Sequence, residues 1–221
     1  MAMTKAEFFR HVDHSLLKPN LLKQDIVDGL NYARENHAVA VCVLPTYVEL
    51  AAKMLQGSDV AVGTVVGFPN GTHTTFTKVA ETKDLFAMGA LELDMVIDVS
   101  AMRSGDYNKV RDDIAAVVQA APGGIIKVIL ENFYLTKDEI VKGSRLVEEA
   151  GAHYVKTSTG FAGGGATLED IVLMRKSVSP KVKVKAAGGI NTLDDALKLI
   201  EAGSDRIGIS RTRQIVAEFD K

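Results

Sequence analysis

The segment from 181 to 210 reads KVKVKAAGGINTLDDALKLIEAGSDRIGIS and contains a complete strand–helix–strand unit. Its start, KVKVKAAGG, alternates lysine with small or β-branched apolar residues, which is typical of a β-strand. The stretch TLDDALKLIEAG (192–203) follows with apolar residues at helical spacing and a terminal glycine, Gly203, of the kind that ends helices. The run DRIGIS (205–210) then returns to strand character. Strands joined by a helix run parallel, so this unit predicts a parallel sheet.

The same rhythm extends toward the N-terminus. Strand-like runs occur near 11–14 and at 38–45, 59–69, 91–98, 124–131 and 152–158, with helical segments between them. Two of these helical segments begin with a capping pattern, Thr136 with Glu139 and Thr167 with Asp170. Eight strand–helix units favour a closed barrel over an open sheet, because (β/α)8 barrels commonly need about 200–250 residues. We therefore expect an α/β fold: a single-domain (β/α)8, or TIM, barrel over residues 1–221 with a short N-terminal helix.

Composition narrows the functional classes. The net charge is −2, which gives no electrostatic basis for binding nucleic acid or an anionic membrane. The single cysteine, Cys42, excludes an internal disulfide and zinc sites of two or four cysteines, and the five histidines show no metal-binding spacing. The N-terminus does not resemble a signal peptide, and no segment approaches the roughly 20 apolar residues of a membrane span. We expect a soluble cytoplasmic protein with no nucleic-acid or membrane partner, no cofactor and no metal.

Several strands carry ionisable residues on one face. Because successive strand residues point to opposite sides, Asp94, Lys156 and Lys185 each lie opposite the apolar face that helices would cover, and they must then point into the barrel. Lysine and aspartate are seldom buried unless paired, and each buried ion costs several kcal/mol. All three residues lie toward the C-terminal halves of their strands, where barrels of this type hold their active sites.

Other charged residues share these inward faces. Lys127 and Lys183 are interpreted as structural partners of Glu92, Asp98 or Glu131.

Two lysines beside a carboxylate have a specific chemical use. A neutral lysine amine attacks a carbonyl to form an imine, but a lysine with a pKa of about 10.4 is roughly 0.1% or less neutral at pH 7. Burial and a second ammonium both lower that pKa. Lys156 and Lys185 would form such a pair, and Asp94 would move protons. An interior salt-bridge network without chemistry is the structural alternative.

Glycine-containing loops follow the last three strands, in KTSTGFAGGG (156–165), AAGGIN (186–191) and RIGIS (206–210). Glycines allow backbone N–H groups to approach an anion closely, and the helices that follow add their N-terminal dipoles. Three such loops in succession predict a phosphate site, which the later strands of these barrels often host. The glycine triplet at 163–165 is interpreted as a flexible loop before the helix at Thr167.

Longer motifs run in order from about residue 11 to residue 216. They are VDHSLLKP (12–19), VCVLP (41–45), TVVGFPNG (64–71), ELDMVID (92–98), YVKTSTGF (154–161), GGATLEDIVLM (164–174), VKAAGGI (184–190) and RIGIS (206–210). Together they resemble the deoxyribose-phosphate aldolase (DeoC) family, and the pairing of VKTSTGF with VKAAGGI is highly specific. The resemblance implies a class I aldolase, a lyase that needs no metal or organic cofactor. It implies reversible cleavage of 2-deoxy-D-ribose 5-phosphate to acetaldehyde and D-glyceraldehyde 3-phosphate, in deoxyribonucleotide catabolism.

The resemblance also assigns roles by position. Lys156 matches the Schiff-base lysine, Lys185 the second active-site lysine and Asp94 the proton-relay aspartate. Asp13 and Cys42 match supporting residues near the site. The expected substrate and phosphate contacts are Thr157, Thr159, Gly160, Gly188, Gly189, Asn191, Gly208, Ser210 and Arg211. The expected partners are sugar phosphates and aldehydes, and a homodimer is one candidate assembly.

Two positions depart from the family pattern. Asn191 stands where relatives often carry arginine, and Arg211 replaces the second serine of the usual G-T-S-S-G sequence. One hypothesis is that Arg211 supplies the phosphate counter-charge in place of residue 191; the alternative is that it points to solvent and phosphate binds more weakly. Two other functions stay open: a different imine-forming aldolase, such as a transaldolase-like enzyme, and a sugar-phosphate-binding barrel without turnover.

Overall fold

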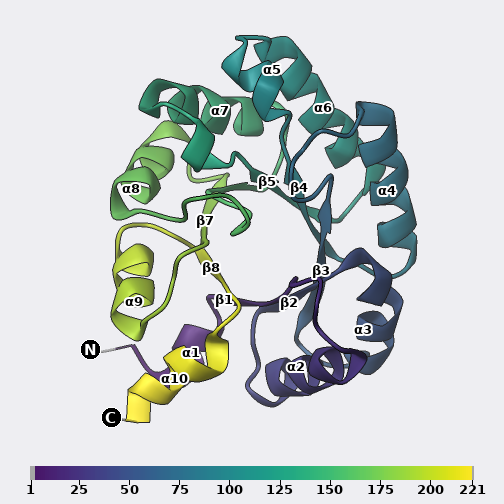
Figure 1. Ribbon diagram of the computed structural model, residues 1–221, viewed down its shortest axis with the longest axis vertical. Coiled ribbons are helices and arrows are strands. Elements are labelled where there is room, and N and C mark those ends of the chain that lie inside the picture. The colour runs from purple at the N-terminus through teal and green to yellow at the C-terminus, as the bar shows by residue number, and fades with distance from the viewer. Residues whose placement is uncertain (1–2, 221) are drawn as a thin grey trace.

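Eight parallel strands close into a barrel in the computed structural model, which describes residues 3–220 (Figure 1). The strands follow one another in chain order, and β8 pairs with β1 to complete the ring. Their bounds are β1 (Val12–Leu16), β2 (Ala40–Val43), β3 (Ala61–Val66), β4 (Glu92–Val96), β5 (Ile125–Ile129), β6 (Tyr154–Lys156), β7 (Lys183–Ala187) and β8 (Arg206–Ile209). Each strand coincides with or overlaps a run expected from the sequence, so the barrel prediction is confirmed. Of the expected domain 1–221, residues 1, 2 and 221 lie outside the described part.

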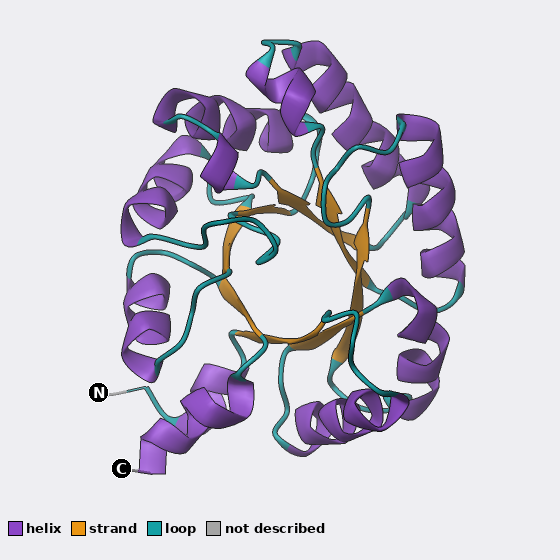
Figure 2. Cartoon of the chain, in the orientation of Figure 1, coloured by secondary structure: helices purple, strands orange, loops and turns teal. Residues whose placement is uncertain are grey.

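Ten α-helices occur in residues 3–220 and surround the barrel (Figure 2). Their bounds are α1 (Lys5–Phe9), α2 (Lys23–Glu35), α3 (Val48–Met54), α4 (Thr75–Ala87), α5 (Val99–Arg103), α6 (Tyr107–Ala120), α7 (Lys137–Glu149), α8 (Leu168–Ser177), α9 (Leu193–Glu201) and α10 (Thr212–Val216). The expected short N-terminal helix is α1. Every strand is followed by at least one α-helix, and β4 is followed by two. Within the described residues, no helix has the length and apolar character needed to cross a bilayer.

The two predicted capping patterns turn out differently. At the start of α7, Thr136 and Glu139 form the expected capping box. At the start of α8, the Thr167 side chain accepts from the Asp170 N–H as expected, but the Asp170 carboxylate accepts instead from Lys137 Nζ at 2.6 Å. The Asp170 part of the prediction was wrong because a cation on α7 competes for that carboxylate.

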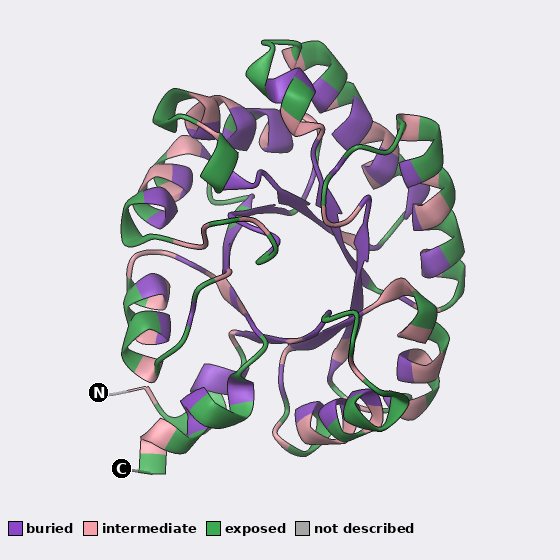
Figure 3. Cartoon of the chain, in the orientation of Figure 1, coloured by how far each residue is buried: buried purple, intermediate pink, exposed green. Residues whose placement is uncertain are grey.

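Apolar side chains join the strands to the helices. Leu93, Met95 and Val184 occupy the outward strand faces and are fully buried. Figure 3 shows buried residues along the strands and on the inner sides of the helices, with exposed residues on the outer sides. Burial of this apolar surface is the main stabilising contribution to the barrel.

Two charged residues at strand ends do not have the contacts expected of them. Lys183, the first residue of β7, is exposed, and its Nζ lies 5.8 Å from the centre of the ring of Tyr154, its partner in the strand register, rather than beside a carboxylate. Asp98 lies beyond β4, where its side chain caps α5 by accepting from the Ala101 N–H and also pairs with Lys109. Alternation applies only while the backbone stays extended, so it does not give the direction of Asp98, which lies beyond the end of β4. Lys183 keeps the inward parity but lies at the open N-terminal end of the barrel, where it is exposed.

A buried ion pair ties two helices to the end of β4. Lys78 of α4 is fully buried, and its Nζ donates to Asp113 Oδ2 of α6 at 2.6 Å and to Val96 O at 2.9 Å. Val96 is the last residue of β4, two residues after Asp94. The pair therefore helps to fix the strand end that carries Asp94.

We expect Lys78→Met to lower the free energy of unfolding by about 3 kcal/mol or more, because it leaves the Asp113 carboxylate buried without its cation. Urea titration measures the effect. Lys109→Met is the matched control, since its pair with Asp98 lies near the surface and its loss should change stability little. Equal destabilisation by the two variants would contradict this account of Lys78.

Candidate active site

Three lysines converge on the carboxylate of Asp94 inside the barrel. Lys156 and Lys185 donate to Oδ2 at 2.7 and 2.6 Å, and Lys127 donates to Oδ1 at 2.9 Å. Asp94 is fully buried, and none of the three lysines is more than 3% exposed. Strand register explains the convergence, because Asp94 pairs with Lys127 across β4 and β5, and Lys156 with Lys185 across β6 and β7. The structure brings together the three residues expected to carry the chemistry and adds Lys127.

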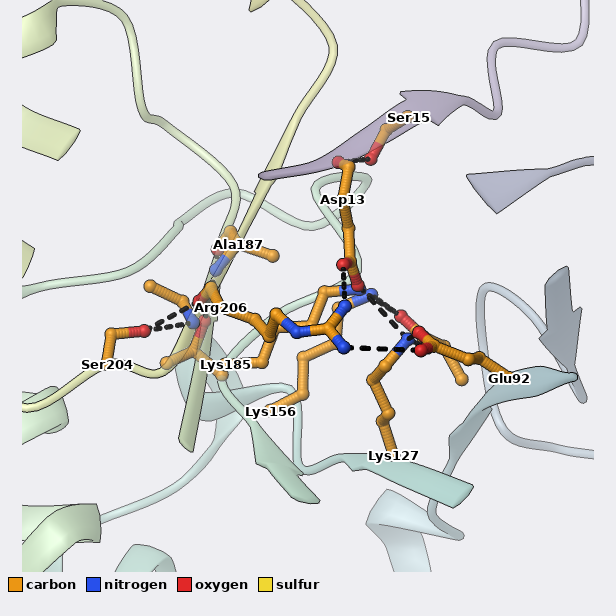
Figure 4. Close-up of polar contacts among 12 residues, drawn as sticks. Asp13, Ser15, Glu92, Lys127, Lys156, Lys185, Ala187, Ser204 and Arg206 are labelled. Carbon is orange, nitrogen blue, oxygen red and sulfur yellow. Dashed lines mark hydrogen bonds and ion pairs between the residues drawn. The ribbon is translucent and has the colours of Figure 1, made fainter. Parts of the chain in front are cut away.

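Further charges lie beside this group. Asp13 of β1 accepts from Lys185 at 2.5 Å and from Arg206 of β8 at 2.7 Å, and it lies 3.1 Å from Lys127 Nζ. Glu92 pairs with Lys127 at 2.6 Å and with Arg206 at 3.3 Å. Figure 4 shows the Arg206 side chain extending between Asp13 and Glu92. Asp13, expected as a supporting residue, is therefore bound directly to Lys185.

The charges of this cluster do not balance when every group is ionised. The cations are Lys127, Lys156, Lys185 and Arg206, and the anions are Asp13, Glu92 and Asp94. Four positive and three negative charges leave an excess of one positive charge, and a buried charge without a counter-ion is strongly disfavoured. Release of one proton from a lysine of the cluster removes the excess.

Lys156 is the lysine that releases its proton most readily. Burial is the largest influence on its pKa and lowers it, the Asp94 carboxylate opposes burial, and the Lys185 ammonium lowers the pKa further, so the net shift is downward. For Lys185, burial also acts to lower the pKa, but Asp13 and Asp94 outweigh it and raise the pKa above its ordinary value. The site therefore favours a neutral amine at Lys156 beside an ammonium at Lys185, as a Schiff-base nucleophile requires.

Asp94 and Lys127 hold their ordinary charges firmly. Burial would raise the pKa of Asp94, but Lys127, Lys156 and Lys185 outweigh it and bring the pKa well below its usual range. Burial would lower the pKa of Lys127, but Asp13, Asp94 and Glu92 outweigh it and raise the pKa well above the usual range. Asp94 is therefore an anion, and Lys127 is a fixed ammonium rather than a nucleophile.

Cys42 lies on β2 close to the charged cluster. Its thiol is buried, and burial, with a smaller contribution from Asp94, raises its pKa to about 11. The buried neighbours Leu17 and Val65 pack against it. A thiol with a raised pKa is a poor nucleophile, so the structure gives Cys42 a packing position beside the site. In residues 3–220, no group of three or more His, Cys, Asp or Glu side chains is placed to hold a metal ion.

Lys156 also lines a cavity of about 210 Å³ that reaches the loops after β6, β7 and β8. Eight of the expected contact residues line it: Thr159, Gly160, Gly188, Gly189, Asn191, Gly208, Ser210 and Arg211. Lys18, from the loop after β1, lines it as well and adds a cation that the sequence reasoning did not select. Glycine backbone and two cationic side chains suit an anion.

Thr157 does not line this cavity, so its assignment as a substrate contact was wrong. It is fully buried, and its hydroxyl donates to Ala187 O and accepts from the Ala187 N–H, both at 3.1 Å. As the neighbour of Lys156 in the chain, it points to the other side of β6. Its side chain joins β6 to β7 instead.

Within the glycine triplet, Gly165 is required by close packing, so the interpretation of the triplet as merely a flexible loop was wrong at this position. A Cβ on Gly165 would lie 2.3 Å from the Gly188 carbonyl oxygen, whereas Cβ atoms on Gly163 and Gly164 would meet only the exposed ring of Phe133. The Ala166 N–H also donates to Ala187 O and Gly188 O, at 3.1 and 3.0 Å. The loop between β6 and α8, which curls over the barrel opening in Figure 2, therefore supports the cavity wall at Gly188.

Glu131 and Arg206 are site residues whose contacts the sequence reasoning missed. The Glu131 carboxylate accepts from the N–H and the hydroxyl of Thr159 rather than from a lysine, and its backbone is left-handed, with φ of 56°. Arg206 could have been found by parity, because it precedes Gly208 and Ser210 on the same strand face. Glu131 lies beyond the end of β5, where alternation no longer shows its direction.

Comparison with known proteins identifies the family. A model described as DeoC/LacD family aldolase matches residues 8–218. The chain belongs to this family of aldolases. It is therefore a lyase, and the cavity described above lies where a family member needs its active site, at the C-terminal ends of the strands, with Lys156, the last residue of β6, joining it to the charged cluster inside the barrel.

Relatives cover nearly the whole chain. The deoxyribose-phosphate aldolase of Bacillus cytotoxicus is 53% identical over 211 residues, which are 95% of each chain. The enzyme of the same name from Staphylococcus epidermidis is 50% identical over 214 residues, which are 97% of this chain and 96% of the relative. The tetrameric deoxyribose phosphate aldolase from Aeropyrum pernix is 26% identical and superposes with a TM-score of 0.92, over 99% of this chain and 93% of that one.

We expect Gly165→Ala to weaken phosphate binding at least about tenfold, roughly 1.4 kcal/mol, because the new methyl group displaces Gly188 from the cavity wall. Displacement of a bound sugar phosphate by inorganic phosphate measures the change. Gly163→Ala is the control, since its methyl group meets only the ring of Phe133, which is 55% exposed and can move away. Equal effects of both variants would rule out the supporting role of Gly165.

Proposed function

We propose that this protein is a class I aldolase that reversibly cleaves 2-deoxy-D-ribose 5-phosphate to acetaldehyde and D-glyceraldehyde 3-phosphate, with Lys156 as the Schiff-base residue. The observation that carries the proposal is the contact of Lys156 and Lys185 with one oxygen of Asp94, at 2.7 and 2.6 Å, at the end of an anion-suited cavity. Relatives at about half identity over nearly the whole chain carry the same enzyme name.

The first stage joins the sugar to the enzyme. The neutral Lys156 amine attacks the C1 carbonyl of the open-chain sugar, the nitrogen loses a proton to the Asp94–Lys185 pair, and the former carbonyl oxygen gains one. Lys185 then gives a proton to the carbinolamine hydroxyl, which leaves as water, so that a protonated imine forms. Asp94 is suited to relay these protons because Lys156 and Lys185 share its Oδ2.

The second stage breaks the carbon chain. Lys185, now neutral, removes the proton of the C3 hydroxyl through Asp94, the C2–C3 bond breaks, and its electron pair moves into the imine to give an enamine. D-Glyceraldehyde 3-phosphate leaves. Lys185 returns the proton to C2 and is neutral again. Water then adds to the protonated imine, and acetaldehyde leaves with a free, neutral Lys156, while the proton released in this step passes through Asp94 to Lys185 and restores its ammonium form. The water consumed here balances the water released in the first stage.

The phosphate end of the substrate fits the cavity beyond Lys156. The backbone at Gly188, Gly189 and Gly208 has no side chain to keep a phosphate group away from it. Lys18 and Arg211 add positive charge to the cavity lining. Arg211 Nη1 also donates to Asn191 Oδ1 at 3.4 Å, which keeps its guanidinium at the rim of the cavity. This contact supports the hypothesis that Arg211 replaces the cation missing at residue 191.

The organisation of the enzyme is part of the proposal. Residues 1–221 would form one aldolase domain, because the family match extends over 8–218. A cytoplasmic location suits an enzyme of phosphorylated sugars. We propose a homodimer or larger homo-oligomer, by analogy with the tetrameric relative from Aeropyrum pernix.

We expect Lys156→Ala to abolish acetaldehyde release from 2-deoxy-D-ribose 5-phosphate and to prevent the adduct that borohydride traps in the presence of acetaldehyde. Lys183→Ala is the control, because Lys183 lies on the next strand but is exposed outside the site; it should retain both activities. Peptide mapping locates the adduct. Trapping at another lysine, or none in the wild type, would exclude Lys156 as the nucleophile.

We expect Arg211→Ala to lower kcat/KM for 2-deoxy-D-ribose 5-phosphate about tenfold or more and to leave kcat/KM for unphosphorylated deoxyribose nearly unchanged, because only the phosphate ester gains from the guanidinium. Arg213→Ala is the control, since Arg213 donates to Asp28 O on the outer side of the barrel. Similar losses for both substrates would remove the counter-charge role of Arg211.

A further inference from the structure

Three charged residues of the barrel interior have no part in the steps described above. Lys127 shares the Asp94 carboxylate with the reacting Lys156 and also touches Asp13 and Glu92. Arg206 touches Asp13 and Glu92, so Arg206 and Glu92 are linked to Lys156 through Asp13, Lys127, Lys185 and Asp94. Glu92 and Lys127 are at most 2% exposed. Desolvating three ions costs several kcal/mol each, which a purely structural barrel avoids by using apolar residues here.

We propose that Glu92, Lys127 and Arg206 are positioning residues that set the protonation of Lys156 by fixing the charge of the whole cluster. The inference rests on the proposed role of Lys156 as the Schiff-base nucleophile. These three residues contribute two positive charges and one negative charge. Asp13, Asp94 and Lys185 contribute two negative charges and one positive charge. The two sets cancel, so the cluster is neutral when Lys156 is an uncharged amine.

The contacts show how the outer charges reach Lys156. Lys127 occupies Asp94 Oδ1, which leaves Oδ2 as the oxygen that Lys156 and Lys185 share. Arg206 occupies Asp13 Oδ1, which leaves Oδ2 to Lys185 and Lys127. Without these two cations, both aspartates would have an unused negative oxygen, and a proton on Lys156 would be stabilised.

Four titratable groups interact with Lys156 directly: Asp94 on β4, Lys185 on β7, Cys42 on β2 and Glu131 beyond β5. Asp13 on β1, Glu92 on β4, Lys127 on β5 and Arg206 on β8 are linked to it through Asp94 and Lys185. The Cys42 thiol stays protonated because burial raises its pKa to about 11. The Glu131 carboxylate accepts from Thr159 and makes no ion pair with the cluster, so its contacts are the same in every variant considered below. The variants therefore act on Lys156 through the two aspartates, Glu92 and the other three cations.

The charge count makes predictions of opposite sign. In Glu92→Gln one negative charge is lost, so the excess of positive charge grows and Lys156 stays neutral to lower pH. In Arg206→Gln one positive charge is lost, so Lys156 retains its proton to higher pH. Glu92→Gln combined with Arg206→Gln loses one charge of each sign and restores the original count. A unit charge at short range in a protein of effective dielectric about 20 shifts such an equilibrium by about one pH unit or more.

The experiment measures the pH dependence of kcat/KM for 2-deoxy-D-ribose 5-phosphate, whose acid limb reports groups of the free enzyme. The pH dependence of borohydride trapping of acetaldehyde at Lys156 provides a second measurement. We expect the acid limb to move down by about one pH unit in Glu92→Gln, up by about one unit in Arg206→Gln, and back near the wild-type position in the double variant. If the residues had a purely structural role, the losses of activity of the two single variants would add in the double variant, and its pH profile would not return to that of the wild type.

Three results would overturn the proposal: shifts of the same direction in both single variants, no shift in either, or a double variant whose profile is not restored. If a single variant does not fold, Lys127→Gln with Glu92→Gln provides a second charge-compensated pair, and its profile must again resemble that of the wild type. Failure of the proposed function has a different signature, because the wild type itself would then form no trapped adduct at Lys156.

Discussion

The carboxylate of Asp94, shared by three lysines inside a closed barrel, is the interaction on which the chemistry depends. It attracts Lys156, Lys127 and Lys185 to within 2.9 Å. One carboxylate cannot compensate three ammonium groups. Asp13 and Glu92 add two negative charges, but both also pair with Arg206, which adds a fourth positive charge. The interior is therefore one negative charge short of balance, and the shortage is met by the amine that has the fewest carboxylate contacts, Lys156.

The fold supplies this arrangement through strand register and alternation. Parallel pairing places Asp94 beside Lys127 and Lys156 beside Lys185. Because side chains alternate between the two faces of a strand, all four side chains point into the barrel. The helices outside cover the opposite faces and keep water away from the strands. A lysine at the surface would keep its proton, so the closed barrel and the reactivity of Lys156 have the same physical origin.

Much of this could be predicted from the sequence because strand alternation and loop glycines are local signals. The eight strands, the inward direction of Asp94, Lys156 and Lys185, and the three glycine loops that border the cavity followed from them, and the family resemblance then gave most of the individual lining residues. The errors arose where the signal ends or where partners are distant. Asp98 and Lys183 lie at strand ends, and Thr157 lies on the opposite face from Lys156. The requirement for Gly165 depends on the backbone of Gly188, 23 residues away in the chain by residue number. Arg206 and Glu131 owe their roles to residues on other strands and loops.

Neutron diffraction of the ligand-free protein at mildly alkaline pH tests the central claim most directly, because it locates the hydrogen atoms on each lysine Nζ. We expect two hydrogens on Lys156 Nζ and three on the Nζ atoms of Lys127 and Lys185, with no hydrogen on Asp94. Three hydrogens on Lys156 and two on Lys185 would contradict the account, since the nucleophile would then be the other lysine. A proton on the Asp94 carboxylate would contradict it as well, because Asp94 would then be neutral and could not compensate the positive charges of Lys127 and Lys185.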